Sequence, residues 1–269
     1  MAPAARRPRL GQHFLRSGSI LDRIARRVQA AAAGSDLVVE IGAGPGTLTR
    51  RLLAADLRVV AIEIDPRLAA SLRARQEGDS RLEVVEADIL QVDLAALIAA
   101  RTARPAVVVG NLPYYITSPI VRKIFEAVET VSEAILLVQK EVAVRIAARE
   151  GSRDYGFLSV LCQAHSRPEL LFTVPPGAFD PPPKVLSAVV RLPIEPRWKS
   201  WGVSDPAAFL EFVQLCFHHK RKTLRNNLAG AFGRERLAAV AEGRLRGEQL
   251  APERLAELWL RLADLRPAR

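Results

Sequence analysis

The chain has 269 residues, of which 49% are hydrophobic and 25% are charged, and it contains two cysteines. This composition is ordinary for a globular protein with a core and excludes a disordered, collagen-like or disulfide-rich chain. No apolar run reaches the roughly 18 residues that a membrane-spanning helix needs, so no membrane partner is expected. The formal net charge of +10 indicates a polyanionic partner such as a nucleic acid, although an arginine-rich surface without that role gives the same balance.

The cysteines and histidines give no sign of a metal site. Cys162 and Cys216 stand in apolar surroundings, and the four histidines are not spaced with one another or with the cysteines as ligands are. We therefore expect no metal and no disulfide, in reducing, cytoplasmic surroundings. Residues 1–16 are interpreted as a short basic arm rather than a targeting signal, because they lack an apolar core segment. Nothing in the sequence demands more than a monomer.

The first two thirds of the chain alternate between helical and strand patterns. A helix is predicted over Ser17–Ala33, where apolar residues recur at helical spacing. Short β-branched runs follow, hydrophobic along nearly their whole length as strands covered on both faces must be. They are Leu37–Ile41, Val59–Ile64, Leu82–Val85, Ala106–Val109 and Ala134–Val138, and stretches between them such as Thr47–Ala55 and Pro66–Gln76 are predicted helices. The alternation predicts a doubly wound α/β domain with a parallel sheet.

The pattern changes after Glu150. Two further strands, Leu170–Val174 and Val185–Leu192, flank a Pro-rich turn and can form a terminal antiparallel hairpin on the same sheet. The remainder is predicted to be all-helical, with helices at Pro206–Phe217, Lys220–Ala231, Arg234–Ala241 and Pro252–Ala263. The prolines at 193 and 196 predict a boundary between a domain of residues 1–196 and a small helical C-terminal domain of residues 197–269.

A glycine-rich turn, Glu-Ile-Gly-Ala-Gly-Pro-Gly-Thr-Leu-Thr at Glu40–Thr49, follows the first predicted strand of the sheet and opens a helix. Glycines allow the backbone to turn sharply and to approach a ligand more closely than a Cβ permits. Dehydrogenases, flavoproteins and methyltransferases share such a turn, so the turn alone does not identify the ligand. Two acids make the prediction more specific. Glu63 ends the second strand, where a carboxylate can accept from both ribose hydroxyls. Asp88 follows the third, where it can accept from an adenine amine.

These features together predict a nucleoside pocket. NAD fits it less well than a methyl donor does. The spacing Gly42-x-Gly44-x-Gly46 differs from the usual Gly-x-Gly-x-x-Gly, and methyl transfer accounts better for Asp88.

The fourth strand is followed by Asn111-Leu112-Pro113-Tyr114. The N6 lone pair of adenine is delocalised into the ring, so the amine is a poor nucleophile. Two acceptors, the Asn111 side-chain carbonyl and the Leu112 backbone carbonyl, are suited to hold it nearer tetrahedral geometry for a direct displacement. Tyr114 offers a ring on which the base can stack, and Pro113 stiffens the turn.

An adenine taken from its helix or loop needs a second stacking surface. Phe179, within a rigid Pro-rich segment, is a candidate for it. An ordinary core position explains the same residue, and the sequence leaves both interpretations open.

In combination these motifs resemble the ribosomal small-subunit RNA adenine dimethyltransferase family. The resemblance covers most of the chain in the right order: Gly11–Leu15, Glu40–Thr49, Asn111–Tyr114, Phe179–Ser187 and Lys220–Leu228. It implies a Rossmann-like class I methyltransferase domain that uses S-adenosyl-L-methionine. It also implies N6,N6-dimethylation of two adjacent adenosines in the loop of the last helix of small-subunit rRNA, late in ribosome assembly.

The resemblance also assigns roles to individual positions. His13 and Leu15 close over the methionine end of the cofactor, with Gly42 beneath it. Glu63 binds the ribose and Asp88 the cofactor's adenine. Asn111 is the catalytic asparagine on the cofactor side, and Tyr114 and Phe179 lie beside the target base.

A basic cluster, His218–Arg225, is predicted to open a helix of the C-terminal domain and to contact RNA phosphates. A charge run is more often a solvated face, but the net charge favours the phosphate contact. Together with Arg6, Arg7, Arg9 and Arg16 this cluster can frame the mouth of the pocket.

Three other functions stay open. The nearest is the related methyltransferase that modifies large-subunit rRNA and confers macrolide resistance, where Asn-Ile-Pro-Tyr tends to replace Asn-Leu-Pro-Tyr. A DNA adenine methyltransferase commonly carries Asp or Asn followed by Pro-Pro in this loop. A non-catalytic assembly or transcription factor keeps the fold only to bind RNA, but the intact Asn111, Tyr114, Glu63 and Asp88 favour an enzyme.

Overall fold

The computed structural model describes residues 13–75 and 78–264, without the side chains of residues 263 and 264. The chain divides into two compact units. The first comprises the described residues up to Lys140 together with Leu171–Arg191, and the second comprises Glu141–Leu170 together with the described residues from Leu192 onward. Most of the predicted basic arm, including Arg6, Arg7 and Arg9, lies outside the described residues.

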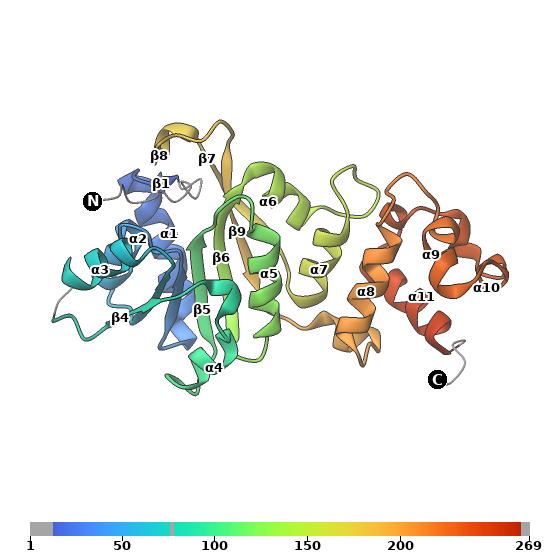
Figure 1. The fold of residues 1–269 in the computed structure, drawn as a ribbon, viewed down its shortest axis with the longest axis horizontal. Helices are drawn as coiled ribbons and strands as arrows, with labels where there is room; N and C mark the ends of the chain where they lie inside the picture. Colours follow the sequence, from blue (N-terminus) through green and yellow to red (C-terminus); the bar gives the residue numbers. More distant parts are fainter. Residues whose placement is uncertain (1–12, 76–77, 265–269) are drawn as a thin grey trace, which may run out of the picture. The chain divides into compact units, whose positions relative to one another are not determined.

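A seven-stranded mixed sheet carries the first unit (Figure 1). Its strands lie in the order β4 (Leu82–Glu86), β3 (Val59–Glu63), β2 (Val38–Ile41), β5 (Ala106–Asn111), β6 (Val131–Gln139), β9 (Ser187–Pro193) and β7 (Glu169–Val174). The first five pair in parallel, with registers such as Val38 opposite Val59 and Val107. The five predicted runs are therefore parallel strands of one sheet. The two later runs pair with each other at its edge, as a terminal hairpin requires.

Helices cover both faces of this sheet because its central strands are apolar on both sides. On one face, α1 (Gly18–Ala31) and α2 (Thr47–Ala54) share a core with alternate residues of the strands, among them Val38, Val107 and Ile135. Buried side chains of α4 (Leu94–Ala99) and α5 (Thr117–Glu126) lie outside that core, and α5 packs on β6. The remaining helix of this unit, α3 (Pro66–Arg75), packs beside β3 and β4.

Two short strands that the sequence did not predict lie outside this sheet. Phe14–Leu15 forms β1 and Phe179–Asp180 forms β8, and they pair antiparallel with Leu15 opposite Phe179. A two-residue strand has no periodicity of its own, so only the pairing reveals it. The pairing places the N-terminal segment beside the Pro-rich turn, which contains the 3₁₀ turn η3 (Pro176–Ala178).

The second unit is built from helices. It contains α6 (Lys140–Ala147), α7 (Phe157–His165), α8 (Pro206–Cys216), α9 (Leu224–Phe232), α10 (Arg234–Ala238) and α11 (Pro252–Asp264), with 3₁₀ turns η4 (Arg197–Trp201), η5 (Ala241–Arg244) and η6 (Gly247–Gln249). Apolar side chains from α7, α8, α9 and α11 share one core, in which the Tyr155 hydroxyl donates to the Leu250 carbonyl at 3.0 Å. Among the described residues, no helix combines the length and the apolar character that crossing a bilayer requires.

The compact units do not coincide with the predicted division at residue 196. Residues 141–170, assigned from sequence to the first domain, pack with the C-terminal helices, because Ala148, Tyr155 and Val160 belong to the same apolar core as α8. The boundary near Leu192 lies close to the expected proline pair. A separate functional role for residues 197–269 stays a prediction.

The predicted helix at Lys220 is wrong at its start. The chain turns through residues 217–223 and α9 begins at Leu224, after Thr223 in an extended conformation. Asn227 holds this turn, accepting from the His219 amide at 3.2 Å and donating to the Cys216 carbonyl at 2.9 Å. Most of the basic cluster therefore lies in a turn and not on a helix.

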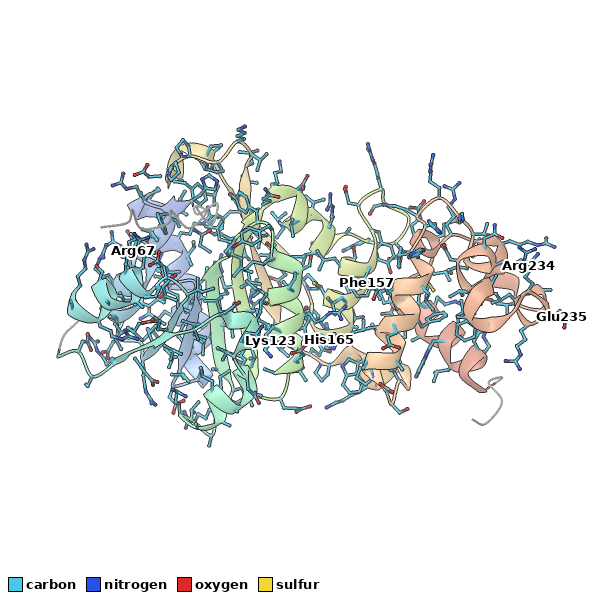
Figure 2. The ribbon with its side chains drawn as sticks, in the orientation of Figure 1. Arg67, Lys123, Phe157, His165, Arg234 and Glu235 are labelled. Carbon is cyan, nitrogen blue, oxygen red and sulfur yellow. The ribbon has the colours of Figure 1, made fainter. Side chains whose placement is uncertain are left out.

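Figure 2 shows which of its labelled side chains are exposed and which are buried. Arg67 of α3 and Arg234 of α10 point away from the ribbon, whereas His165 of α7 is buried within its unit. Its Nδ1 lies 3.0 Å from the Leu161 carbonyl, and burial lowers the pKa of its imidazole. His165 is therefore a core histidine.

Close packing at the end of β5 gives a first test. A Cβ at Gly110 would lie 2.7 Å from the Ile41 carbonyl oxygen, which belongs to the neighbouring strand. We expect Gly110→Ala to lower the free energy of unfolding by about 1–3 kcal/mol, since the strands must move apart. Gly34→Ala is the control, because nothing lies within 4 Å of its added Cβ. Equal thermal midpoints for the two variants, measured by circular dichroism, would contradict this account.

Candidate active site

The glycine-rich turn joins β2 to α2 and adopts a conformation that favours glycine. Gly42, Gly44 and Gly46 have φ values of 71°, 57° and 74°, in the left-handed region that L side chains rarely adopt. A Cβ on Gly44 would approach the Phe14 ring to 3.0 Å, and one on Gly46 would lie 2.5 Å from Leu72 Cδ1. The turn therefore needs these glycines for both backbone conformation and space.

Glu63, at the end of β3, fixes the position of this turn. Its Oε2 accepts from the Gly44 amide at 2.7 Å and its Oε1 from the Asp65 amide at 2.9 Å. Glu63 is 2% exposed, and its hydrogen bond with the Gly44 amide is shielded from water. Each oxygen keeps a second lone pair, which can accept from a ligand hydroxyl as the sequence predicted.

Asp88 follows β4 and caps the 3₁₀ turn η2 (Ile89–Gln91). Its Oδ1 accepts from the Leu90 amide at 3.0 Å. Among the described residues nothing donates to Oδ2, which leaves this atom for a ligand amine. The cap holds the carboxylate at the sheet's carboxyl edge.

A cavity of about 290 Å³ opens at this edge, the position where doubly wound sheets bind ligands. Most of the predicted site residues line it: His13, Gly42, Glu63, Asp88, Asn111, Leu112 and Tyr114. Apolar walls come from residues that the sequence did not single out: Ile41, Ile62, Ile64, Ile89, Leu90, Ile116 and Ile120. Apolar walls with a few convergent polar groups suit a nucleoside.

The Asn111 side chain, at the end of β5, has a defined orientation. Its Nδ2 donates to the His13 backbone carbonyl at 2.8 Å. A carbonyl can only accept, so the amide nitrogen must face His13 and the Oδ1 atom must face the opposite way. No described group donates to Oδ1 or to the Leu112 carbonyl. Both acceptors predicted from the sequence are thus available together on the cavity wall.

Tyr114 is held by two contacts. Its hydroxyl shares a hydrogen bond of 2.8 Å with Ser187 Oγ, and its ring stacks on that of His13 with centroids 5.7 Å apart. Burial raises the pKa of the phenol, and the Ser187 hydrogen bond opposes this shift. Tyr114 is therefore a neutral, oriented aromatic surface. Ser187 falls within the segment that carried the family resemblance, but no sequence pattern pairs it with Tyr114.

The pairing of the two short strands connects the N-terminal segment to the Pro-rich turn. Arg16 Nη1 donates to Asp180 Oδ2 at 2.6 Å, and His13 Nδ1 donates to the Pro181 carbonyl at 2.7 Å. The Arg16 amide also donates to the Ala178 carbonyl at 2.8 Å. These contacts hold the His13 carbonyl where Asn111 meets it.

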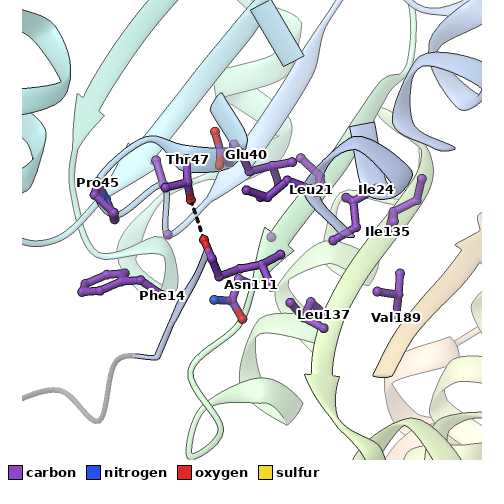
Figure 3. A pocket seen from close by; sticks show the side chains of 16 residues that line it. Phe14, Leu21, Ile24, Glu40, Pro45, Thr47, Asn111, Ile135, Leu137 and Val189 are labelled. Carbon is purple, nitrogen blue, oxygen red and sulfur yellow. Dashed lines mark hydrogen bonds between the residues drawn. The ribbon is translucent and has the colours of Figure 1, made fainter. Parts of the chain in front are cut away.

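Two predicted site residues do not lie on the wall of this cavity. Leu15 is buried and lines a second, smaller cavity of about 30 Å³, where its carbonyl accepts from Thr47 Oγ1 at 3.1 Å (Figure 3). Phe179 is 5% exposed and packs within the same apolar core as Leu15. In this conformation Phe179 is a core residue, the second of the two interpretations that the sequence left open. Its contact with the target base stays a prediction.

Glu40, on β2 just before the glycine-rich turn, lies on the wall of the smaller cavity (Figure 3). Its Oε2 accepts from Thr49 Oγ1 at 2.6 Å. Burial raises the pKa of Glu40 to about 8; the Thr49 hydrogen bond opposes this shift, and the charge of Glu63 adds to it. Glu40 therefore ties β2 to α2 as a largely protonated acid at neutral pH.

The basic cluster at His218–Arg225 is in the second unit. Lys220 Nζ lies 3.9 Å from Glu248 Oε2 and also donates to the Arg153 carbonyl. Arg221 and Lys222 are exposed, and Lys222 lowers the pKa of His219. Phosphate contact by this cluster stays a prediction. In the part of the chain that the structure describes, no three His, Cys, Asp or Glu side chains gather as metal ligands.

Comparison with known proteins decides the family. A family model described as ribosomal RNA adenine dimethylase matches residues 4–266. The chain belongs to the ribosomal RNA adenine dimethylase family. As a member of this dimethylase family it is a methyltransferase that uses S-adenosylmethionine.

Relatives in this dimethylase family match along nearly their whole length. The chain is 45% identical to a "Ribosomal RNA small subunit methyltransferase A" of Acidobacterium capsulatum, over 96% of this chain and 92% of the relative. It is 44% identical to the protein of the same name from Koribacter versatilis, over 95% and 94%.

Solved structures agree. A dimethyladenosine transferase from Plasmodium falciparum superposes with a TM-score of 0.76 at 26% identity, covering 94% of this chain and 98% of that one. The 23S rRNA methyltransferase ErmE superposes with a TM-score of 0.66 at 31% identity, covering 93% and 99%.

The cavity fits the cofactor of the dimethylase family. Gly42 and Gly44 line it without a Cβ, Asp88 Oδ2 can accept from an amine, and Glu63 can accept from hydroxyls. Ile64 and Ile89 supply apolar wall for a purine. An adenosine derivative with a free amine and a ribose satisfies this donor and acceptor pattern.

The buried Glu40 gives a pH prediction. Its pKa is about 8 in the folded chain against 4.5 for an ordinary glutamate, so the folded state keeps a proton that the unfolded state has lost. Stability must therefore fall as pH rises from 4.5 through 8. Glu40→Gln removes this titration, and wild-type thermal stability should fall relative to the variant across that range, by on the order of a few kcal/mol. If the stability of the two proteins changed in parallel with pH, the raised pKa of Glu40 would be contradicted.

Glu211→Gln is the matched control for this measurement. Glu211 is an exposed glutamate on α8. We expect its thermal midpoint to follow that of the wild type at every pH.

Proposed function

We propose that this protein methylates N6 of two adjacent adenosines in the loop of the 3′-terminal helix of small-subunit rRNA, giving N6,N6-dimethyladenosine. The observation that carries the proposal is the pair of unpaired acceptors, Asn111 Oδ1 and the Leu112 carbonyl, on the wall of a nucleoside-sized cavity. An exocyclic amine has two N–H groups, so two acceptors match it.

The choice of the small subunit rests on the relatives. Curated proteins named for the small subunit are 40–48% identical to this chain, whereas the structure named for 23S rRNA is 31% identical. Methylation of large-subunit rRNA is therefore the second candidate, and the experiment below separates the two.

The chain's own groups orient the substrate. When bound, S-adenosylmethionine supplies an electrophilic methyl group on its sulfonium. Asn111 Oδ1 and the Leu112 carbonyl accept from the two N–H groups, which directs the amine lone pair away from them. Both are neutral acceptors and weak bases, so they position the amine and leave its proton until the nitrogen has become more acidic. Tyr114, fixed by Ser187, supplies a face on which the base stacks.

The partner is an immature small ribosomal subunit, bound by a monomer in the cytoplasm as a late step and checkpoint of its assembly. The net charge of +10 supports a polyanionic partner. The basic turn at His218–Arg225 is the candidate for phosphate contact in the second unit.

The deciding measurement is radiolabelled methyl transfer to small subunits from a strain that lacks this modification, followed by nucleoside analysis. Label recovered as N6,N6-dimethyladenosine near the RNA 3′ end is the expected result. Large subunits and naked RNA are assayed in parallel. Transfer to large subunits alone would favour the second candidate, and no transfer to any substrate would exclude the proposal.

Asn111→Ala tests the mechanism. We expect methyl transfer to fall by roughly 10²-fold or more, because one of two groups that orient the amine is lost. Cofactor binding by calorimetry and the thermal midpoint are measured on the same samples, so that a folding defect is recognised. Asn226→Ala, at an exposed asparagine of α9, is the control and should leave both the cofactor affinity and the thermal midpoint unchanged. Undiminished transfer by Asn111→Ala would contradict the assigned role.

A further inference from the structure

Three large apolar side chains are exposed in the two loops that meet beside the cavity. Tyr115 is 62% exposed, Val185 45% and Leu186 42%. Tyr115 also lines the cavity wall. We call these three residues the apolar rim. Grouped exposed apolar side chains mark a binding surface more often than isolated ones do.

The loops of the apolar rim are joined and held. Tyr114, next to Tyr115, shares a hydrogen bond of 2.8 Å with Ser187, next to Leu186. The Leu186 carbonyl accepts from the Lys140 amide at 2.9 Å, and the Leu112 amide donates to the Leu137 carbonyl at 3.0 Å. Strand β6 and its end thus anchor both loops. The rim side chains are therefore exposed on loops whose backbones are held by hydrogen bonds.

Two cations accompany the rim. Lys184 directly precedes Val185, and Lys140 donates its backbone amide to Leu186; both lysines are exposed, and neither forms an ion pair with a described acid. The acid nearest to Lys184 along the chain, Asp180, is engaged by Arg16 at 2.6 Å, and Glu141, which follows Lys140, lies 3.9 Å from Arg145. Aromatic and apolar surface combined with unneutralised lysines is the pattern that binds single-stranded nucleic acid, in which bases stack and phosphates meet cations.

We propose that the apolar rim, with Lys140 and Lys184, binds the nucleotide directly adjacent to the target adenosine in the same RNA strand, with the adjacent base stacked on Tyr115. The inference rests on the proposed function, since a base that enters the cavity leaves its covalent neighbour at the mouth. It adds a contact outside the groups that hold the reacting amine.

A stacking surface also suits the product. Dimethylation removes both N–H donors of adenine but leaves its π-face intact. Stacking on an aromatic ring tolerates different bases for the same reason. Tyr115 can therefore hold the neighbouring adenosine before and after it is methylated, which two adjacent modified positions require.

Kinetics on small subunits give the first test. Tyr115→Ala should lower kcat/KM for the subunit by about tenfold, the loss expected for one base–aromatic stack, and Tyr115→Phe should retain wild-type values. Leu186→Ala should lower it less, while Leu170→Ala, at an equally exposed leucine of β7 outside the rim, should not change it. Unchanged kcat/KM for Tyr115→Ala, with active wild-type protein, overturns this inference alone. Inactive wild-type protein overturns the proposed function.

A binding readout independent of turnover is the second test. An RNA hairpin with 2-aminopurine beside the target adenosine should lose fluorescence when wild-type protein binds, because stacking quenches this base. Tyr115→Ala should abolish that change while leaving the affinity for S-adenosylmethionine unchanged. Fluorescence unaffected by wild-type protein overturns the proposal. Loss of cofactor affinity in Tyr115→Ala with full quenching assigns the ring to the cofactor and also overturns it.

The lysines give an ionic test. Each phosphate contact contributes a slope of about 0.7–0.9 to the dependence of log affinity on log salt concentration. Lys184→Ala should reduce the slope for the hairpin by about that amount. Lys123→Ala should not change it, since Lys123 lies on α5 and pairs with Glu126 at 3.4 Å. Equal slopes for wild type and Lys184→Ala overturn the phosphate contact.

Discussion

The hydrogen bond from Asn111 Nδ2 to the His13 carbonyl joins the end of β5 to a residue 98 positions earlier in the chain. A primary amide has a donor end and an acceptor end, and rotating it exchanges them. Because the His13 carbonyl can only accept, the amide has one favourable orientation, with its nitrogen toward His13 and its oxygen free of any described donor. The chemistry of this site needs that oxygen, so a backbone carbonyl with no catalytic property of its own determines what Asn111 can do.

The rest of the site follows from the sheet. Parallel strands end at the same edge, so β2, β3, β4 and β5 bring the glycine turn, Glu63, Asp88 and Asn111 to one place. Hydrogen bonds then orient the individual groups, which their place at the sheet edge does not do by itself. Glu63 clamps the turn, Asp88 caps η2, and Ser187 orients Tyr114.

Local sequence patterns predicted much of this arrangement. The five parallel strands were identified from β-branched runs, and the residues that end them proved to share a cavity. Contacts between segments far apart in the chain could not be predicted from the sequence, because no periodicity encodes them. Strand β1 has two residues, Ser187 resembles any strand serine, and the role of His13 is played by its backbone. For Phe179 the local pattern itself was ambiguous, since an aromatic residue in a rigid turn suits a stacking site and a core position equally well.

The pairing of β1 with β8 bears on how this fold can be rearranged. Circular permutation works where new chain ends fall in exposed segments that carry few contacts. Here the segment at residues 13–16 is tied to Ala178, Asp180 and Pro181, and through His13 to the catalytic amide. A permuted gene that opened the chain within this segment would leave the sheet intact and remove the geometry of Asn111. An opening at Gly151, in an exposed turn of the second unit, leaves that connection whole.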